Sequence, residues 1–212
     1  MEFSYSSELL NKHITPKTCK DVLQYSVEEV IALTGIYGIE KSFKNITVVQ
    51  FEGYYPALTI SITLDKIGLE LIRRIRFDER YIYNDKFKVR EEFRQQGHAL
   101  RMLENQIDVA TSSGFDDLRC WAYGGAHVDP KIFCGHIIWA KLGFTPFDRS
   151  IEEFADWLKL NKRTETTMQQ LMSTDNGREL WNDFGTDLLV IFNLSKKSKN
   201  RIALKAYKDT KI

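Results

Sequence analysis

The chain has 212 residues, 43% of them hydrophobic and 28% charged, which is typical of a globular protein with one sizeable domain or at most two small ones. Its 30 basic and 29 acidic side chains almost cancel, which argues against nucleic acid or an anionic membrane as a partner. The three cysteines have unrelated spacings, and neither a secretory signal nor a bilayer-spanning apolar run is visible, so we expect a cytoplasmic protein.

The first part of the chain predicts a helix followed by an antiparallel meander. An apolar stripe at helical spacing predicts a helix over residues 21–33. β-branched residues over 46–52 predict a strand, and strict alternation over 58–64 predicts a strand with one buried face. Residues 69–77 follow as the return strand of a hairpin.

The next strand, which ends at Val89, carries a carboxylate among apolar side chains. Period-two alternation predicts that one face of this strand is shared by Tyr81, Tyr83, Asp85, Phe87 and Val89. Apolar surroundings would raise the pKa of Asp85, which makes it a candidate general base. The alternative is an edge residue whose side chain turns to solvent at a bulge, and Glu70 or Glu79 could then replace it.

The turn after this strand reads Arg94-Gln95-Gln96-Gly97-His98-Ala99 and runs directly into a predicted helix. The first amides of a helix have no partner within it and lie at the positive end of its dipole, so they favour an anion. Gly97 has no Cβ, which lets a ligand approach the backbone. The pattern therefore predicts a phosphate site; the alternative is a plain connection with a stray glycine.

The remaining elements alternate between strands and helices. We expect a helix over 98–113, a strand over 117–123, a helix over 130–142, weakly patterned helices over 151–172, a buried strand over 187–194 and a helix ending at Tyr207. No linker composition divides the chain, so we expect one domain over 1–212. Its parts would be a helical segment (1–45), a motif core (57–147), a helical excursion (150–180) and a closing strand and helix (187–208).

Several of these features together resemble the GNAT superfamily of N-acetyltransferases. Residues 94–99 match the family's Gln/Arg-x-x-Gly-x-Gly/Ala turn between a strand and a helix. Trp139-Ala140-Lys141-Leu142-Gly143-Phe144 is similar to the family's Tyr-x-Lys-Leu-Gly-Phe. With the strand that ends at Val89 and the strand Leu118–Tyr123, the resemblance covers roughly residues 57–147 in the expected order.

The resemblance implies an α/β (α+β) fold with a mixed, mostly antiparallel twisted sheet flanked by helices. It also implies transfer of an acyl group, normally acetyl from acetyl-CoA, to a small-molecule or peptide amine by direct attack. The amides from Gln95 to Leu100 would hold the pyrophosphate, and the pantetheine arm would pair with Phe87 and Val89 like an extra strand. The implied cofactor-binding residues are Phe87, Val89, Arg94, Gln95, Gln96, Gly97, His98, Ala99 and Leu100. The thioester would lie near Asp85, Phe87, Cys120 and Trp121, and Asp85 and Cys120 are the candidate catalytic residues.

Two departures from the family pattern stand out. Trp139 occupies the position of the tyrosine that reprotonates the leaving thiolate, and an indole N–H is no acid near neutral pH. Only residues 53–56 separate the first two strands, where the family places helices, so the register differs or the helical part precedes the sheet.

These departures keep further possibilities open. Cys134 or His136 is a weak substitute for the missing acid, and a non-catalytic binding module of a larger assembly is the alternative function. Cys120, His127, Cys134 and His136 match no standard zinc spacing, so no metal is predicted. The oligomeric state stays open.

Overall fold

The computed structural model describes residues 25–36, 45–51, 57–64, 68–125 and 134–209. Helices and mostly antiparallel strands alternate along this chain, which confirms the predicted α+β class. Contacts between residues divide the chain into two compact units, Met1–Asp116 and Asp117–Ile212. Each unit is described by itself below. The prediction of a single domain stays a prediction.

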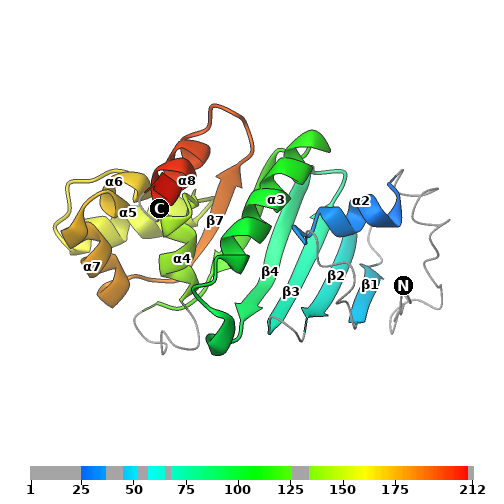
Figure 1. Ribbon diagram of the computed structural model, residues 1–212. Helices are drawn as coiled ribbons and strands as arrows, with labels where there is room; N and C mark the ends of the chain where they lie inside the picture. The colour runs from blue at the N-terminus through cyan, green and yellow to red at the C-terminus, as the bar shows by residue number, and fades with distance from the viewer. Residues whose placement is uncertain (1–24, 37–44, 52–56, 65–67, 126–133, 210–212) are drawn as a thin grey trace. The chain divides into compact units, whose positions relative to one another are not determined.

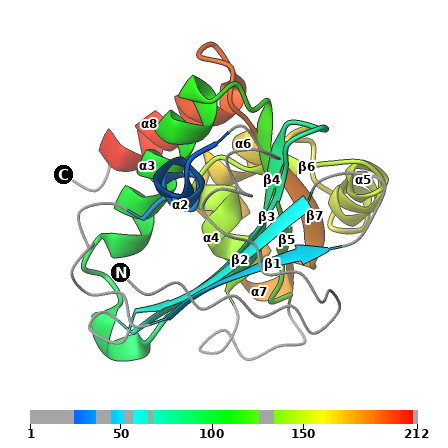
Figure 2. The same ribbon diagram turned by 90° about the vertical axis from the view of Figure 1, so that its right-hand side faces the viewer.

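The N-terminal unit is a four-stranded antiparallel meander with helices on one face (Figures 1 and 2). Its elements are α2 (Val27–Ala32), β1 (Asn45–Phe51), β2 (Ala57–Leu64), β3 (Leu69–Arg76), β4 (Tyr81–Val89), the 3-10 helix η3 (Glu91–Phe93) and α3 (His98–Ser112). Helix α2 begins after Ser26, whose hydroxyl accepts a hydrogen bond from the Glu29 amide in a capping box. Because α2 precedes β1, a described part of the helical segment does precede the sheet.

The core of this unit lies between the meander and α3. Alternate residues of β2 and β3 are buried, among them Leu58, Ile60, Ile62, Leu69, Leu71 and Ile75. They meet the buried stripe of α3, which contains Met102, Leu103, Ile107 and Ala110. The period-two and helical patterns of the sequence therefore identify the two surfaces that pack together.

A β-bulge interrupts the pairing of β3 with β4. Ile72 pairs with Lys86 and Arg73 pairs with Asn84, so Asp85 has no partner residue on β3. One extra residue reverses the faces of the strand on either side of it. Phe87 and Val89 therefore share the face of their buried partners on β3, whereas Tyr81 and Tyr83 lie on the opposite face. The prediction that all five residues share one face is therefore wrong for Phe87 and Val89, whereas Tyr81 and Tyr83 do lie on the face of Asp85.

The C-terminal unit is a three-stranded antiparallel sheet, in the order β5-β7-β6, between helices. Its elements are β5 (Asp117–Ala122), α4 (Gly135–Lys141), β6 (Thr145–Pro146), α5 (Ser150–Leu160), α6 (Met168–Met172), α7 (Asp175–Phe184), β7 (Leu188–Asn193) and α8 (Lys199–Asp209). Helices α4 and α8 cover one face and α5 covers the other (Figures 1 and 2). The predicted weak helix over 151–172 is two helices, with residues 161–167 between them.

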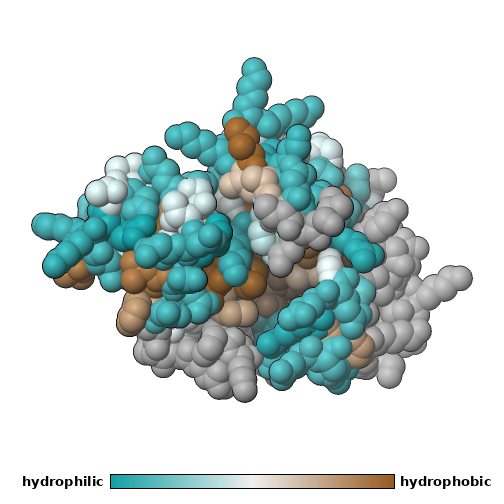
Figure 3. Space-filling model, turned by 60° about the vertical axis from the view of Figure 1, so that its left-hand side comes forward, coloured by the Kyte–Doolittle hydropathy of each residue, from teal (hydrophilic) through white to brown (hydrophobic). Residues whose placement is uncertain are grey.

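Large aromatic side chains fill the centre of this unit. Trp181, Phe144 and Phe192 have at most 1% of their surface exposed. The Trp181 indole N–H donates to the His136 carbonyl oxygen at 2.9 Å, which satisfies its polar atom inside the core. On the face of the molecule drawn in Figure 3, hydrophilic residues predominate. None of the helices that the structure describes is long and apolar enough to cross a membrane.

Candidate functional site

The start of α3 presents a row of backbone amides that have no acceptor. Within the described chain, none of the amides from Gln95 to Leu100 donates a hydrogen bond; the first that does is Arg101, which donates to the Gly97 carbonyl oxygen at 3.1 Å. Gly97 is the N-cap residue and is exposed, and it has no side chain to satisfy these amides. The predicted unsatisfied helix N-terminus is therefore present in the structure.

The backbone of this turn is unusual at two positions. Gln95 and Gly97 both have positive φ, at 63° and 76°. Glycine adopts this conformation without cost, whereas for Gln95 it costs about 1–2 kcal/mol. A Cβ built on Gly97 would meet only the Arg101 guanidinium, at 3.7 Å. The conformation of Gly97 thus favours glycine, and the space around it is open except for Arg101.

The first turn of this helix contains a basic side chain and no acidic one. Asp and Glu are the residues that usually stabilise a helix N-terminus. Instead, Arg101 lies beside Gly97 and donates from Nη2 to the Gln96 carbonyl oxygen at 3.4 Å. His98 is the first residue of the helix. A site with free amides and no carboxylate of its own is suited to a bound anion.

Arg94 contributes to the shape of this turn. Its Nε donates a hydrogen bond to the Val89 carbonyl oxygen at 3.0 Å. This bond links the end of β4 to the residues that lead into α3. The sequence predicts Arg94 among the cofactor residues and does not single out Arg101. The sequence signal that could have identified Arg101 is its spacing, because a residue four positions after an N-cap lies one helical turn above it.

Phe87 and Val89, the predicted pantetheine-binding residues, lie on the last part of β4 after the bulge. They pair with Leu71 and Leu69 of β3, and both side chains are half-buried. The Arg73 guanidinium lies over the Phe87 ring, with its Cζ 4.9 Å from the ring centre. Pairing of a pantetheine arm with these residues stays a prediction.

Asp85 lies in an environment different from the predicted one. Its carboxylate is partly exposed and forms an ion pair with Arg74, whose Nη2 lies 2.7 Å from Oδ1. The Arg74 guanidinium also lies over the Tyr83 ring, so all three side chains share the outer face of the hairpin. The predicted apolar surroundings of Asp85 are absent. The structure instead has the alternative arrangement, in which the side chain turns to solvent at a bulge.

The two substitutes for Asp85 are ion-paired as well. Glu70 lies 2.5 Å from Lys86 Nζ, and the hydrogen bond and positive charge of Lys86 hold the pKa of Glu70 below its usual value. Glu79 forms an ion pair with Arg76. Both substitutes are therefore held by a basic partner, as Asp85 is by Arg74.

The other predicted chemical groups lie inside the C-terminal unit. Cys120 has no exposed surface, and Trp139 is 7% exposed and packs edge-on against Phe144 with ring centres 4.8 Å apart. His136 is 3% exposed, and its ring lies beside Trp181, with ring centres 6.3 Å apart. None of these three groups is placed to exchange a proton with a ligand.

No metal centre is formed by the described residues. Among them, no three His, Cys, Asp or Glu side chains lie close enough to hold an ion. His127, one of the four candidates, lies outside the described residues.

Comparison with known proteins finds no relative, since neither a protein-family model nor a curated protein matches this chain.

Proposed function

We propose that this protein binds a coenzyme A thioester and transfers its acyl group, normally acetyl, to an amine. The start of α3 carries this proposal: its first amides have no hydrogen-bond acceptor in the described chain, and its first turn contains Arg101 and no acidic side chain. A diphosphate supplies the charge and the acceptor oxygens that such a site requires. The motif at residues 94–99 and its position between a strand and a helix support the same assignment.

The residues that would hold the cofactor are on one continuous segment. The amides from Gln95 to Leu100 would donate hydrogen bonds to the diphosphate, and Arg101 would add positive charge. Phe87 and Val89 would pair with the pantetheine arm. When bound, acetyl-CoA supplies an acyl carbon that is activated towards an amine. Neither Cys120 nor Cys134 forms a disulfide within the described part of the chain, which suits a reducing compartment, so we propose that the protein acts in the cytoplasm.

Asp85 is the best candidate to receive the proton that the amine loses. Its carboxylate is accessible, whereas Cys120 and Trp139 are buried and receive no role in this proposal. Arg74 keeps the carboxylate in a fixed place at the bulge through hydrogen bonds from Nε and Nη2. The proton would move from the amine to the Asp85 carboxylate directly or through a water molecule.

Replacement of Gly97 tests the placement of the diphosphate. Gly97→Val forces a β-branched side chain into a positive-φ position and covers the amides, so we expect calorimetry to show no CoA binding. Gly114→Val is the matched control, because Gly114 ends the same helix with a φ of 80° and its Cβ would also meet an arginine, Arg80, at 3.7 Å. Equal CoA affinity for both variants would contradict the placement.

A second function is favoured by the burial of Trp139. Because the position of the usual acid is part of the core, the protein could bind CoA without catalysis, as a module of a larger assembly. Thiol release from acetyl-CoA, measured against a panel of small and peptide amines, distinguishes the two functions. Binding without release for any amine would favour the module.

A further inference from the structure

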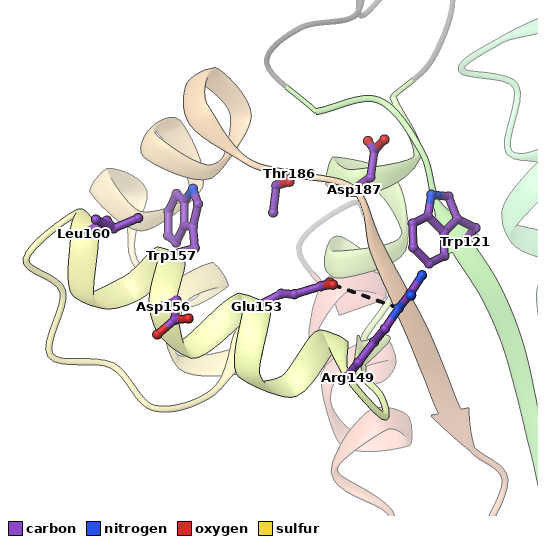
Figure 4. A pocket seen from close by; sticks show the side chains of 8 residues that line it. All are labelled: Trp121, Arg149, Glu153, Asp156, Trp157, Leu160, Thr186 and Asp187. Carbon is purple, nitrogen blue, oxygen red and sulfur yellow. Dashed lines mark ion pairs between the residues drawn. The ribbon is translucent and has the colours of Figure 1, made fainter.

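A groove of about 530 Å³ opens on the C-terminal unit, beside α5 (Figure 4). Trp121 and Arg149 stand at one end, Trp157 and Leu160 stand at the other, and Thr186 lies between them. All the lining residues belong to this unit, so the groove is complete within it. Nothing in the proposed acyl transfer uses it.

Two indole rings form the apolar part of the groove. The Trp157 N–H donates to the Phe184 carbonyl oxygen at 2.7 Å, and its ring packs edge-on against Trp181 with ring centres 4.7 Å apart. These contacts fix the orientation of Trp157. Trp121 carries the Arg149 guanidinium over its ring, with Cζ 5.6 Å from the ring centre. In this groove a guanidinium that belongs to the protein itself therefore already packs against an indole ring.

The charges of the groove are unbalanced. Its lining contains the guanidinium of Arg149 and the carboxylates of Glu153, Asp156 and Asp187, which leaves a formal charge of −2. Asp187 Oδ1 accepts hydrogen bonds from the amides of Gly124 and Gly125 at 2.8 and 2.7 Å, so its position is fixed. Glu153 lies 4.0 Å from Arg149, the one cation of the lining.

Asp156, which is exposed on α5, is the lining carboxylate that no described residue neutralises. Among the described residues it has no hydrogen-bond or ion-pair partner. A negative charge beside rigid indole surfaces attracts a cation that also has an apolar part, because such a ligand gains both the charge interaction and the contact with the rings.

We propose that this groove binds an organic cation with a short apolar stem, of the alkylammonium or alkylguanidinium class. The stem would lie along the indole surfaces of Trp121 and Trp157, and the cation would lie near the carboxylates. The proposal does not depend on CoA. Only the further step, that this cation is the amine acceptor, rests on the proposed function.

Titration of the full chain with n-butylammonium tests the site by nitrogen–proton NMR. The protein has four tryptophans, each with its own indole N–H signal. We expect saturable shifts of the Trp121 and Trp157 signals, since both residues line the groove, and none for Trp139, which does not line it. No saturable shift would overturn the proposal. Equal shifts with 1-pentanol, which is neutral, or with pentanoate, which is an anion, would overturn it as well.

Two carboxylates on α5 provide a matched pair of variants. Asp156→Asn should weaken n-butylammonium binding about threefold, in the range expected for one exposed charge. Glu152→Gln removes an exposed carboxylate of the same helix that does not line the groove, and affinity should not change. Equal affinities for the two variants would contradict a role of the groove. The titration contains no CoA, so its failure leaves the CoA proposal standing, and the loss of CoA binding would leave the cation site standing.

Discussion

Asp85 shows how one extra residue in a strand changes the chemistry of a side chain. The bulge places its carboxylate beside Arg74 on the outer face of the hairpin, where it is accessible to water and to a ligand. In an unbroken strand the same carboxylate would alternate with its neighbours and lie among Tyr83 and Phe87. Accessibility, and not burial, is therefore what makes it a candidate base.

Asp85→Asn separates this role from a structural one. We expect kcat for amine acetylation to fall about 100-fold, since a positioned base contributes about 10²–10⁴. The free energy of unfolding should change by less than about 1 kcal/mol, because the ion pair is exposed. Asp78→Asn, which removes another arginine-paired carboxylate at the end of the same hairpin, should leave kcat unchanged. A variant at position 85 with full kcat would contradict the assignment.

Glu70 predicts a small dependence of stability on pH. Lys86 lowers its pKa in the folded protein, so the carboxylate stabilises the fold above the unfolded-state pKa of about 4.3 and loses this effect as pH falls through the lower folded value. Urea unfolding at pH 7 should therefore find the wild type more stable than Glu70→Gln by less than about 1 kcal/mol, since both partners are exposed. The difference should disappear well below pH 4, and a difference that grows in acid would refute the ion pair.

At the scale of elements, a buried amide pair joins α2, α3 and β4. Asn84 and Gln106 exchange hydrogen bonds of 3.2 and 2.9 Å, and Gln106 Nε2 also donates to the Leu33 carbonyl oxygen at 3.2 Å. Asn84 directly precedes the bulge residue, and Gln106 lies on the helix whose start forms the proposed diphosphate site. The pair thus fixes the bulge and α3 to one another.

Gln106→Leu should destabilise the N-terminal unit. The substitution leaves the buried Asn84 amide and the Leu33 carbonyl without this partner, which costs about 1–3 kcal/mol in urea unfolding. Asn105→Ala, a half-buried neighbour whose amide lies 3.4 Å from the Ile36 carbonyl oxygen, should cost less. The double variant Asn84→Leu with Gln106→Leu should be more stable than Gln106→Leu alone; a lower stability would show that packing, and not the amide pair, dominates.

Periodicity predicts the elements well and the irregularity poorly. The strands of the meander and the core face of α3 follow from alternation and helical spacing, and both are confirmed. Alternation extended through Asp85 gives the wrong face for Phe87 and Val89, and the bulge stood only as the alternative, although Ile82 and Val89 carry a signal: they are out of phase in a period-two pattern. The turn at Gly97 was predictable because its chemistry is local and depends on backbone conformation.

At the scale of the whole molecule, the sequence could not show which side chains the fold buries. Cys120 is a chemically plausible residue near the predicted thioester, but it belongs to the core of the C-terminal unit, as does Trp139 at the position of the usual acid. The groove beside α5 was also missed, because its residues come from three separate stretches of the chain that only the fold brings together. All four tryptophans lie in the C-terminal unit, so indole signals report on it and amide signals are needed for α3.

The most direct test of the diphosphate site is therefore a CoA titration of the full chain followed by backbone amide NMR. The amides of Gly97, His98, Ala99 and Leu100 should show the largest shifts, and the amide of Gly114, just beyond the other end of α3, should show none. Binding of CoA that leaves these four amides unmoved, or no binding at all, would contradict the proposed diphosphate site.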